Sequence, residues 1–297
     1  MQLRFLDYFV ALAREKHFAR AAEACNVTQP TLSAGIAALE ESLGKGWFFR
    51  DLRFIDRTVE GHAIRARAQR LLVDHEALRR TIDAPAGPLR GELRLGAIPA
   101  AMPYVGNFLA ALRKTHAKLT VAIRSLTSRE IERALLAYEL DAGLTYLENE
   151  PLAQVRSLKL YSERYLFVTS ATGPLAALDR ISWADIAATP LCLLHRGMQN
   201  RRILDAYVAS RGLKLSPIAT ADSYIALLSM VAHGGVSSVV TDSHAEFIVG
   251  DAGLRAIDVA NPAPTNAIGL VTVDREPLSL MARTALDIAQ TLAIRSS

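Results

Sequence analysis

Three short polar side chains stand together where one predicted helix begins, and their positions suit contact with a nucleic-acid groove or a phosphate. Gln29, Thr31 and Ser33 lie in the first turns of this helix, where free backbone N–H groups and the helix dipole favour negative partners. Thr28 is suited to cap the helix and Pro30 fits its early positions. Apolar residues at helical spacing make the opposite face, namely Leu32, Ile36, Leu39 and Leu43. The pattern predicts a recognition helix whose candidate DNA contacts are Thr28, Gln29, Pro30, Thr31 and Ser33.

The residues on either side of this helix can complete a DNA-binding unit. Residues 17–27 are typical of an Ala-rich helix closed by Asn26 and a tight turn, which is the arrangement of a helix-turn-helix. Arg50 and Arg53 fall in and after an aromatic hairpin, where a wing would lie beside the phosphate backbone. The same spacing also fits a packed helical hairpin with no role in DNA binding, so these residues alone leave both interpretations open.

A resemblance that covers essentially the whole chain favours the DNA-binding interpretation. The residues that carry it are Phe18-x-x-Ala21-Ala22, then Val27-Thr28-Gln29-Pro30-Thr31-Leu32-Ser33-x-x-Ile36-x-x-Leu39-Glu40-x-x-Leu43-Gly44, and then Phe48, Arg50, Thr58 and Gly61. This pattern resembles the N-terminal signature of the LysR-type transcriptional regulators. The family usually carries Arg at the position of Ala34 and a longer polar residue at Gly35, so this helix lacks an expected contact and has a flexible glycine near its middle.

Composition sets the class of protein. The chain has 297 residues, of which 51% are hydrophobic, so it is long enough for two or three domains and too apolar to be disordered. The net charge is +4, and residues 1–84 hold thirteen Lys or Arg against eleven Asp or Glu, so bulk charge does not single out a DNA-binding half. Cys25 and Cys192 are the two cysteines, and their separation favours small core thiols in a cytoplasmic protein. The chain start carries no apolar signal core and no apolar run could span a membrane.

A long helix after the hairpin carries one continuous apolar seam. Its members step by four and three residues and are Ile64, Ala68, Leu71, His75, Leu78 and Ile82. This spacing is typical of a helix with a single partner helix. We expect the partner to be a second copy of the chain, as it is in the family that the sequence resembles; packing on its own chain is the alternative.

The pattern after residue 91 changes to alternating strands and helices, which predicts two α/β lobes. The resemblance implies a two-lobed fold like that of periplasmic binding proteins, in which crossover strands near residues 164–169 and 267–273 return the chain to the first lobe. The expected organisation is a winged helix-turn-helix domain at 1–58, a dimerisation helix at 59–84, a hinge at 85–91 and an effector domain at 92–297. Lobe I would take about 92–162 and 267–297, and lobe II about 163–266.

A ligand cleft is expected at the helix N-termini of both lobes. The resemblance places its candidate residues at Ala100, Ser128, Arg196, Gln199, Asn200 and Arg201. Ala100 lacks the hydroxyl that the family often has there. For Ser128 and Asn200 the alternative is plain helix capping, and for the two arginines it is a solvated surface charge.

No catalytic or metal-binding motif accompanies these features, so we expect no enzyme activity, no cofactor and no metal. The function that we predict is a cytoplasmic transcriptional regulator that binds an interrupted palindromic operator as a homodimer or homotetramer. Its expected effector is a small carboxylate or other oxyanion, and RNA polymerase is a further candidate partner. The alternative is a cytoplasmic solute-binding protein of the same two-lobed fold whose N-terminal helices contact protein.

Overall fold

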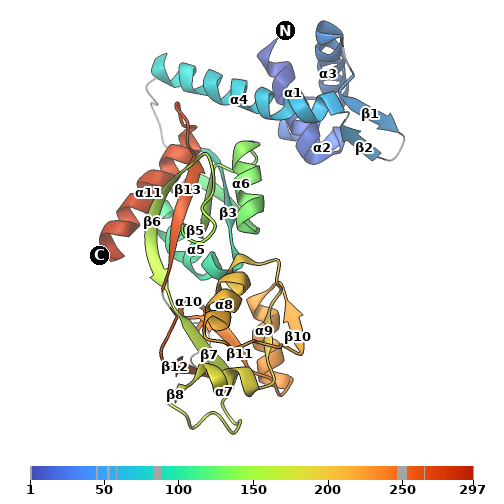
Figure 1. Ribbon diagram of the computed structural model, residues 1–297. Coiled ribbons are helices and arrows are strands. Elements are labelled where there is room, and N and C mark those ends of the chain that lie inside the picture. The colour runs from blue at the N-terminus through green and yellow to red at the C-terminus, as the bar shows by residue number, and fades with distance from the viewer. Residues whose placement is uncertain are drawn as a thin grey trace. The chain divides into compact units, whose positions relative to one another are not determined.

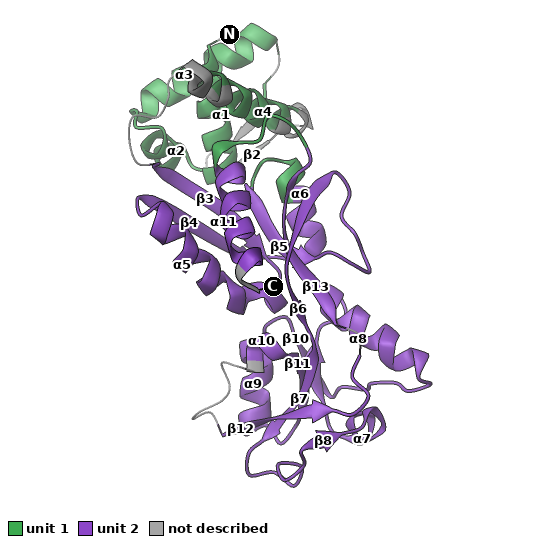
Figure 2. Cartoon of the chain, turned by 90° about the vertical axis from the view of Figure 1, so that its left-hand side faces the viewer, with its two compact units in different colours: residues 1–88, 134–139, 275–280 green, residues 89–133, 140–274, 281–297 purple. Residues whose placement is uncertain are grey.

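The computed structural model describes residues 2–44, 46–51, 54–57, 59–82, 89–245, 253–263 and 265–296. They form two compact units, which Figure 2 colours separately. Unit 1 comprises residues 1–88, 134–139 and 275–280, and unit 2 comprises the remainder. Thr58, Arg53 and the predicted hinge up to residue 88 lie outside the described residues.

Unit 1 contains a helix-turn-helix followed by a hairpin and a long helix (Figure 1). Its elements are α1 (Leu3–Glu15), α2 (Phe18–Ala24), α3 (Gln29–Leu43), β1 (Phe48–Asp51), β2 (Phe54–Arg57) and α4 (Val59–Ile82). The turn between α2 and α3 passes through Asn26, whose φ of 53° is left-handed and suits asparagine. Strands β1 and β2 pair in antiparallel fashion, so the hairpin expected as a wing is present.

The core of unit 1 forms under α1, which supplies six buried residues. Leu32, Ile36 and Leu39 of α3 are fully buried against it, as the helical spacing predicted, whereas Leu43, the last residue of the helix and of the same predicted face, is 47% exposed. Trp47 is also fully buried, and its ring meets that of Phe9 edge to face at 4.8 Å between centroids. The tryptophan before β1 therefore fixes the base of the hairpin to the helical core.

Gly35 is a packing requirement, which corrects our description of it as a flexible residue. It is buried where α3 crosses α1, and a Cβ atom built on it would lie 2.6 Å from Cδ2 of Tyr8 and 2.9 Å from Cδ1 of Phe5. Non-bonded carbon atoms do not approach so closely. The longer residue that is usual in the family cannot fit here unless these two rings move.

Helix α4 packs the first two of the six residues of its predicted seam within its own chain. Ala68 is buried in the core of unit 1 and Ile64 packs against that core. Gln69 donates a hydrogen bond to the carbonyl of Tyr138, which also belongs to unit 1. Leu71 and Leu78 remain 45% and 60% exposed, and the side chain of Ile82 lies outside the described part.

Unit 2 contains two lobes built on separate sheets. Lobe I holds the sheet β4-β3-β5-β13-β6, and lobe II holds the sheets β11-β7-β12-β8 and β10-β9. The strands of lobe I are β3 (Gly91–Ala97), β4 (Leu119–Ser125), β5 (Ala142–Tyr146), β6 (Val155–Glu163) and β13 (Asn266–Val273), and its helical segments are η1 (Pro99–Tyr104), α5 (Val105–Thr115), α6 (Ser128–Leu136) and α11 (Leu280–Ser296). The strands of lobe II are β7 (Tyr165–Ser170), β8 (Arg180–Ile181), β9 (Cys192–Leu194), β10 (Ala219–Ala221), β11 (Ser238–Thr241) and β12 (Leu254–Val259), and its helices are α7 (Trp183–Ala188), α8 (Gln199–Ser210), α9 (Tyr224–His233) and α10 (Asp242–Ala245).

Two connections join the lobes. The chain leaves lobe I at the end of β6 and enters β7 of lobe II within two residues, and it returns between β12 and β13. Strands β6 and β13 pair side by side in antiparallel fashion, so that β6 leads toward lobe II and β13 leads back from it (Figure 1). The expected return strand at 267–273 agrees with β13, and the outward crossing falls at Arg164, the first residue of the expected segment 164–169, whose other residues form part of β7 in lobe II.

The contact between Gly35 and Tyr8 predicts a selective effect of a single methyl group. Gly35→Ala should destabilise unit 1 by about 1–3 kcal/mol, because the added carbon overpacks the junction of α1 and α3. Gly106→Ala is the matched control, since it is also helical but has no atom within 4 Å of the added carbon, and it should stabilise by up to about 1 kcal/mol. Urea unfolding followed by circular dichroism measures both. Equal effects of the two substitutions would contradict this packing.

Candidate functional site

The first turn of α3 presents its polar residues to solvent. Thr28 is the N-cap, and its hydroxyl accepts a hydrogen bond from the backbone N–H of Thr31 at 3.4 Å. The hydroxyls of Thr28 and Thr31 are also 2.8 Å apart, so both are engaged in capping. Gln29 and Pro30 are exposed and Ser33 is half-buried. The side chains of Gln29 and Ser33 take no part in this cap, so their donors and acceptors can bind another molecule.

Positive charge for phosphate contact must come from elsewhere than α3. No lysine or arginine occurs between Gln29 and Leu43. Arg50 lies in β1, but its side chain is outside the described part of the chain, as is the whole of Arg53. The contact of Arg50 and Arg53 with the DNA backbone therefore stays a prediction from the sequence.

A small cavity lies in unit 2 where the two lobes meet. Its walls come from both lobes and are Ile98, Pro99, Ala100, Thr127, Ser128, Tyr146, Leu194, Met198, Gln199 and Asn200. Four of the six residues predicted for an effector site, Ala100, Ser128, Gln199 and Asn200, are thereby brought together. The lining includes no charged side chain, so its polarity comes from hydroxyl groups, carboxamides and the N-termini of α6 and α8.

Ser128 is free of the capping role that was its alternative. Thr127 caps α6 instead, because its hydroxyl accepts from the N–H of Glu130 while the Glu130 carboxylate accepts from the N–H and hydroxyl of Thr127. These hydrogen bonds lower the pKa of Glu130. At α8 the N-cap residue is Met198, so Asn200 is not a cap either. Both polar side chains therefore belong to the cavity wall and not to a helix cap.

Ser128 and Gln199 close the cavity across the two lobes. The Ser128 hydroxyl accepts from Thr145 at 2.9 Å and donates to the side-chain carbonyl of Gln199, and all three residues are at most 4% exposed. The amide nitrogen of Gln199 donates to the carbonyl of Glu148 at 3.3 Å. The enclosed volume is about 10 Å³, which is about the space of one water molecule. A larger ligand can enter only if these hydrogen bonds part.

A second chain of hydrogen bonds crosses between the lobes one residue further along α8. Asn200 donates from Nδ2 to the hydroxyl of Tyr146 at 2.7 Å, and that hydroxyl is bonded to Oε1 of Glu163. Glu163 ends β6 and is fully buried. Burial raises the pKa of Glu163 to about 8; the hydrogen bonds of Tyr146 and Asn200 oppose this rise, and Asp242 adds to it. The carboxyl beside the cavity is therefore mainly a neutral acid at pH 7.

An ion pair forms the third contact from the first turn of α8. Arg202 donates to both carboxylate oxygens of Glu150, at 2.6 and 2.7 Å. The guanidinium holds the pKa of Glu150 below its ordinary value, as expected for a bidentate pair. Gln199, Asn200 and Arg202 together tie the start of one lobe II helix to lobe I.

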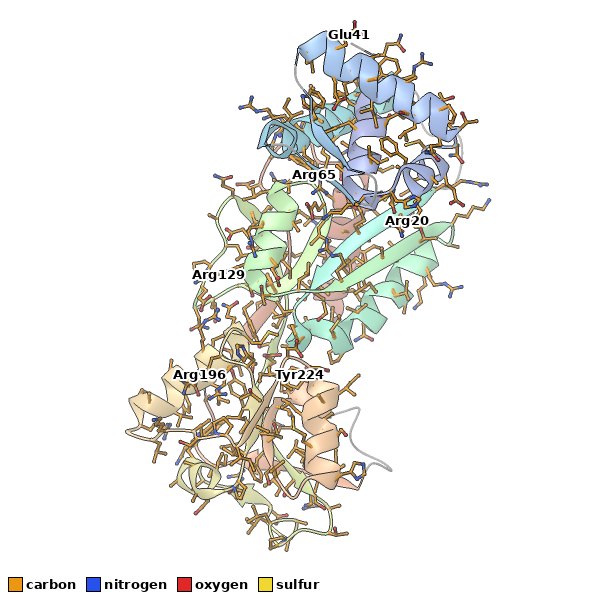
Figure 3. The ribbon with its side chains drawn as sticks, turned by 90° about the vertical axis from the view of Figure 1, so that its right-hand side faces the viewer. Arg20, Glu41, Arg65, Arg129, Arg196 and Tyr224 are labelled. Carbon is orange, nitrogen blue, oxygen red and sulfur yellow. The ribbon has the colours of Figure 1, made fainter. Side chains whose placement is uncertain are left out.

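The two predicted effector arginines lie away from the cavity lining. Arg201 is 1% exposed, and its guanidinium donates to the carbonyl of Leu194 and to Asp205, each at 2.9 Å. Arg196 has a side chain that is 70% exposed, and it lies 4.0 Å from Asp205 (Arg196 is labelled in Figure 3). Arg201 thus fixes the loop that leads into α8, while Arg196 faces solvent.

Three residues of the site were absent from the sequence prediction. Tyr146 is the last residue of a buried strand, and a polar residue at the carboxyl end of such a strand is a usable signal. Glu163 and Arg202 carried no such signal, because a buried acid and a bridging arginine look like surface charges in sequence. Their roles depend on contacts with residues 17 and 52 positions away.

Three other features could carry a function, namely a metal site, a membrane-spanning helix and a reactive thiol. The described residues contain no group of three or more His, Cys, Asp or Glu that could hold a metal ion. Among them no helix is both long and apolar enough to cross a bilayer. Cys25 is half-buried in unit 1 and Cys192 is buried in unit 2, and burial raises the pKa of both thiols.

Comparison with known proteins assigns both parts of the chain. Residues 3–62 match the model of the bacterial regulatory helix-turn-helix proteins of the lysR family, and residues 86–293 match that of the LysR substrate binding domain. The DNA-binding transcriptional dual regulator OxyR of Escherichia coli K12 is 28% identical over 279 residues, which cover 94% of this chain and 91% of that protein. A probable hydrogen peroxide-inducible genes activator of Mycobacterium avium is 29% identical over 90% of this chain and 86% of its own length. A solved full-length OxyR variant of Pseudomonas aeruginosa matches with a TM-score of 0.81 and 26% identity, covering all of this chain and 96% of that one.

Proposed function

This chain belongs to the LysR family of DNA-binding transcriptional regulators, and we propose that its α3 reads an operator while the cavity between its lobes binds a small oxyanion. We further propose that it acts in the cytoplasm, where its operator DNA would lie. The observation that carries the effector proposal is the meeting of Ser128, Gln199 and Asn200 in a cavity without charged walls. Because effector and DNA bind at different places, each influences the other through the relative stability of two states of the chain.

The DNA-reading proposal rests on the free polar groups of the first turn of α3. Gln29 is exposed and its carboxamide can pair with an adenine edge in the major groove. Thr28 and Thr31 are occupied with the cap, so they would serve mainly to place the helix start against the backbone. Since Ala34 is exposed and supplies no polar group, the wing and DNA shape would contribute more of the specificity.

Substitution of Gln29 should separate base reading from backbone contact. Gln29→Ala should weaken operator binding by about 1–3 kcal/mol and leave binding to random DNA nearly unchanged. Arg50→Ala should weaken both and reduce the salt slope by about one. Ser42→Ala, at the far end of α3, is the control that should change neither. Gel-shift titrations at two salt concentrations measure all three, and an equal loss on operator and random DNA for Gln29→Ala would contradict base reading.

Self-association is proposed to use the exposed remainder of the α4 seam. Leu71 and Leu78 are seven residues apart on one face and exposed in the single chain, whereas Ile64 and Ala68 already pack within it. His75 lies between them and is half-buried, so it can serve as the polar member that fixes register. A two-fold pair of such helices would explain recognition of a palindromic operator with two half-sites.

Charges on this seam should dissociate the assembly. Leu71→Asp with Leu78→Asp would bury two unpaired charges per chain at the interface, so light scattering should report a lower mass and operator affinity should fall. The control, Leu71→Met with Leu78→Met, keeps an apolar seam and should keep the assembly. A double Asp variant with unchanged mass would show that this face does not pair.

The oxyanion proposal follows from the donors around the cavity. Ser128 and Asn200 offer a hydroxyl and an amide, and the first turns of α6 and α8 offer backbone N–H groups. Because Glu163 is mainly neutral at pH 7, its carboxyl adds no full negative charge beside an anion there. The ligand would have to displace the Gln199 side chain from Ser128, which would free the Gln199 amide as a further donor.

Hydrogen peroxide is a second candidate for the effector, because several relatives are named hydrogen peroxide-inducible genes activators. The two cysteines of this chain argue against the detection of peroxide by a thiol. A thiol that reacts with peroxide must ionise and be reachable. Cys192 has no exposed surface and a raised pKa, and Cys25 also has a raised pKa. The two cysteines lie in different units. We therefore favour reversible binding over thiol oxidation as the effector signal.

Calorimetry with a panel of small molecules tests the effector proposal. Formate, acetate, oxalate and benzoate should include a ligand for the full chain, while ethylamine and glucose should not bind. Ser128→Ala and Asn200→Ala should each weaken the best acid by about 1–3 kcal/mol, because each removes a buried hydrogen bond to it. Asn107→Ala, an exposed asparagine on α5, is the control. Preferential binding of the amine, or no effect of either cavity substitution, would contradict the proposal.

A further inference from the structure

Glu163 stands where the effector cavity meets the connection between the lobes, although it does not line the cavity. It is the last residue of β6, and the chain enters lobe II directly after it. Its Oε1 is bonded to the hydroxyl of Tyr146, a residue of the cavity wall. Its Oε2 is buried and has no hydrogen-bond partner among the described residues. A carboxyl so placed can act on the cavity through Tyr146.

The direction of the bond between Tyr146 and Glu163 depends on one proton. When Glu163 is a carboxylate it can only accept, so the Tyr146 O–H must point at it. When Glu163 is a carboxylic acid it can donate to the tyrosine oxygen, which already accepts from Asn200. The hydrogen of Tyr146 is then available to another acceptor, and the cavity is a neighbouring space that can hold one.

Burial and Asp242 oppose the ionisation of Glu163, whereas the hydrogen bonds of Tyr146 and Asn200 favour it. The polar and titratable groups that face it are Tyr146 on β5, Tyr161 on β6, Tyr165 on β7, Asn200 on α8, Tyr224 on α9, Asp242 on α10 and its sheet partner Asn266 on β13. Asp242 is already paired with Arg164, at 3.5 Å. None of the groups that face Glu163 is a cation, and burial together with Asp242 raises its pKa to about 8. An anion in the adjoining cavity would oppose ionisation further.

We propose that Glu163 is the residue that couples effector binding to a proton: as a neutral acid it turns the Tyr146 hydroxyl toward the cavity as a donor, and as a carboxylate it withdraws that donor and repels an anion. This inference rests on the proposed binding of an oxyanion between the lobes. Binding at a pH near 8 then takes up a proton from solvent, which adds to the Glu163 carboxylate. Glu163 is a positioning residue here, since it acts through Tyr146.

The pH dependence of binding carries the test. The probe is whichever of formate, acetate, oxalate and benzoate binds the full chain best at pH 6.5. Its affinity should be nearly constant below about pH 7 and should fall above about pH 8, approaching tenfold per unit, because one proton is lost. Calorimetry of the unaltered protein at pH 8 in two buffers of different ionisation enthalpy should show uptake of a fraction of a proton.

Three variants distinguish a role of Glu163 in proton coupling from a role in stability alone. Glu163→Gln places an amide that can donate to Tyr146 as the neutral acid does, so binding should persist and should not decline between pH 7 and 9. Tyr146→Phe should lose at least tenfold in affinity at pH 6.5. Glu92→Gln, an exposed acid on β3, should follow the unaltered protein.

The outcomes are distinct. Binding that is constant from pH 7 to 9, or that declines equally in Glu163→Gln, would overturn the role of Glu163 and leave the effector proposal standing. Failure of every acid to bind at any pH would overturn the oxyanion effector itself. If Glu163→Gln fails to fold, the measurement on the unaltered protein still tests the role of Glu163, because binding at pH 8 without proton uptake would contradict it.

Discussion

The first turn of α8 joins the two lobes of unit 2 beside the cavity that we propose as the effector site, and the proposed response depends on that contact. Gln199, Asn200 and Arg202 each bond to lobe I, to Ser128, Tyr146 and Glu150 respectively. The first turn of α8 can hold all three contacts because Arg201 fixes the loop before the helix, through its hydrogen bond to the carbonyl of Leu194. The small cavity beside this contact has no room for a metabolite, so an effector that binds there must compete with the protein's own polar groups.

This competition sets the size of the response. A net intramolecular hydrogen bond stabilises by about 0.5–1.5 kcal/mol, so the three contacts of α8 together contribute only a few kcal/mol to the closed arrangement, in which Ser243 of α10 also donates to the carbonyl of Ala100 in η1. A small ligand that makes two or three charge-assisted hydrogen bonds in their place, at about 1.5–3 kcal/mol each, can reverse that balance. A shift of this size moves a two-state equilibrium by one or two powers of ten. The cleft is thus suited to a small ligand that makes few but strong contacts.

The sequence was most informative where local patterns decide the structure. The cap at Thr28, the buried stripe of α3 and the alternation of strands and helices all follow local rules, and each is found in the structure. It was less informative for Gly35, whose role depends on the ring of Tyr8 in another helix. The arginines show the same limit, because nothing local distinguishes buried Arg201 from exposed Arg196 or from Arg202. Glu163 was missed for a related reason, since only the fold reveals that no cation faces it.

Amide hydrogen exchange with and without the best-binding acid tests most directly whether the first turn of α8 is the element that the effector moves. The relevant amides are those of residues 127–130 and 199–202, which start the two helices that face each other across the cleft. We predict that saturation with the acid changes the exchange of both segments and that Asn107→Ala preserves the change. Unaltered exchange in both segments, at a ligand concentration where calorimetry shows full occupancy, would contradict a cleft held by α8.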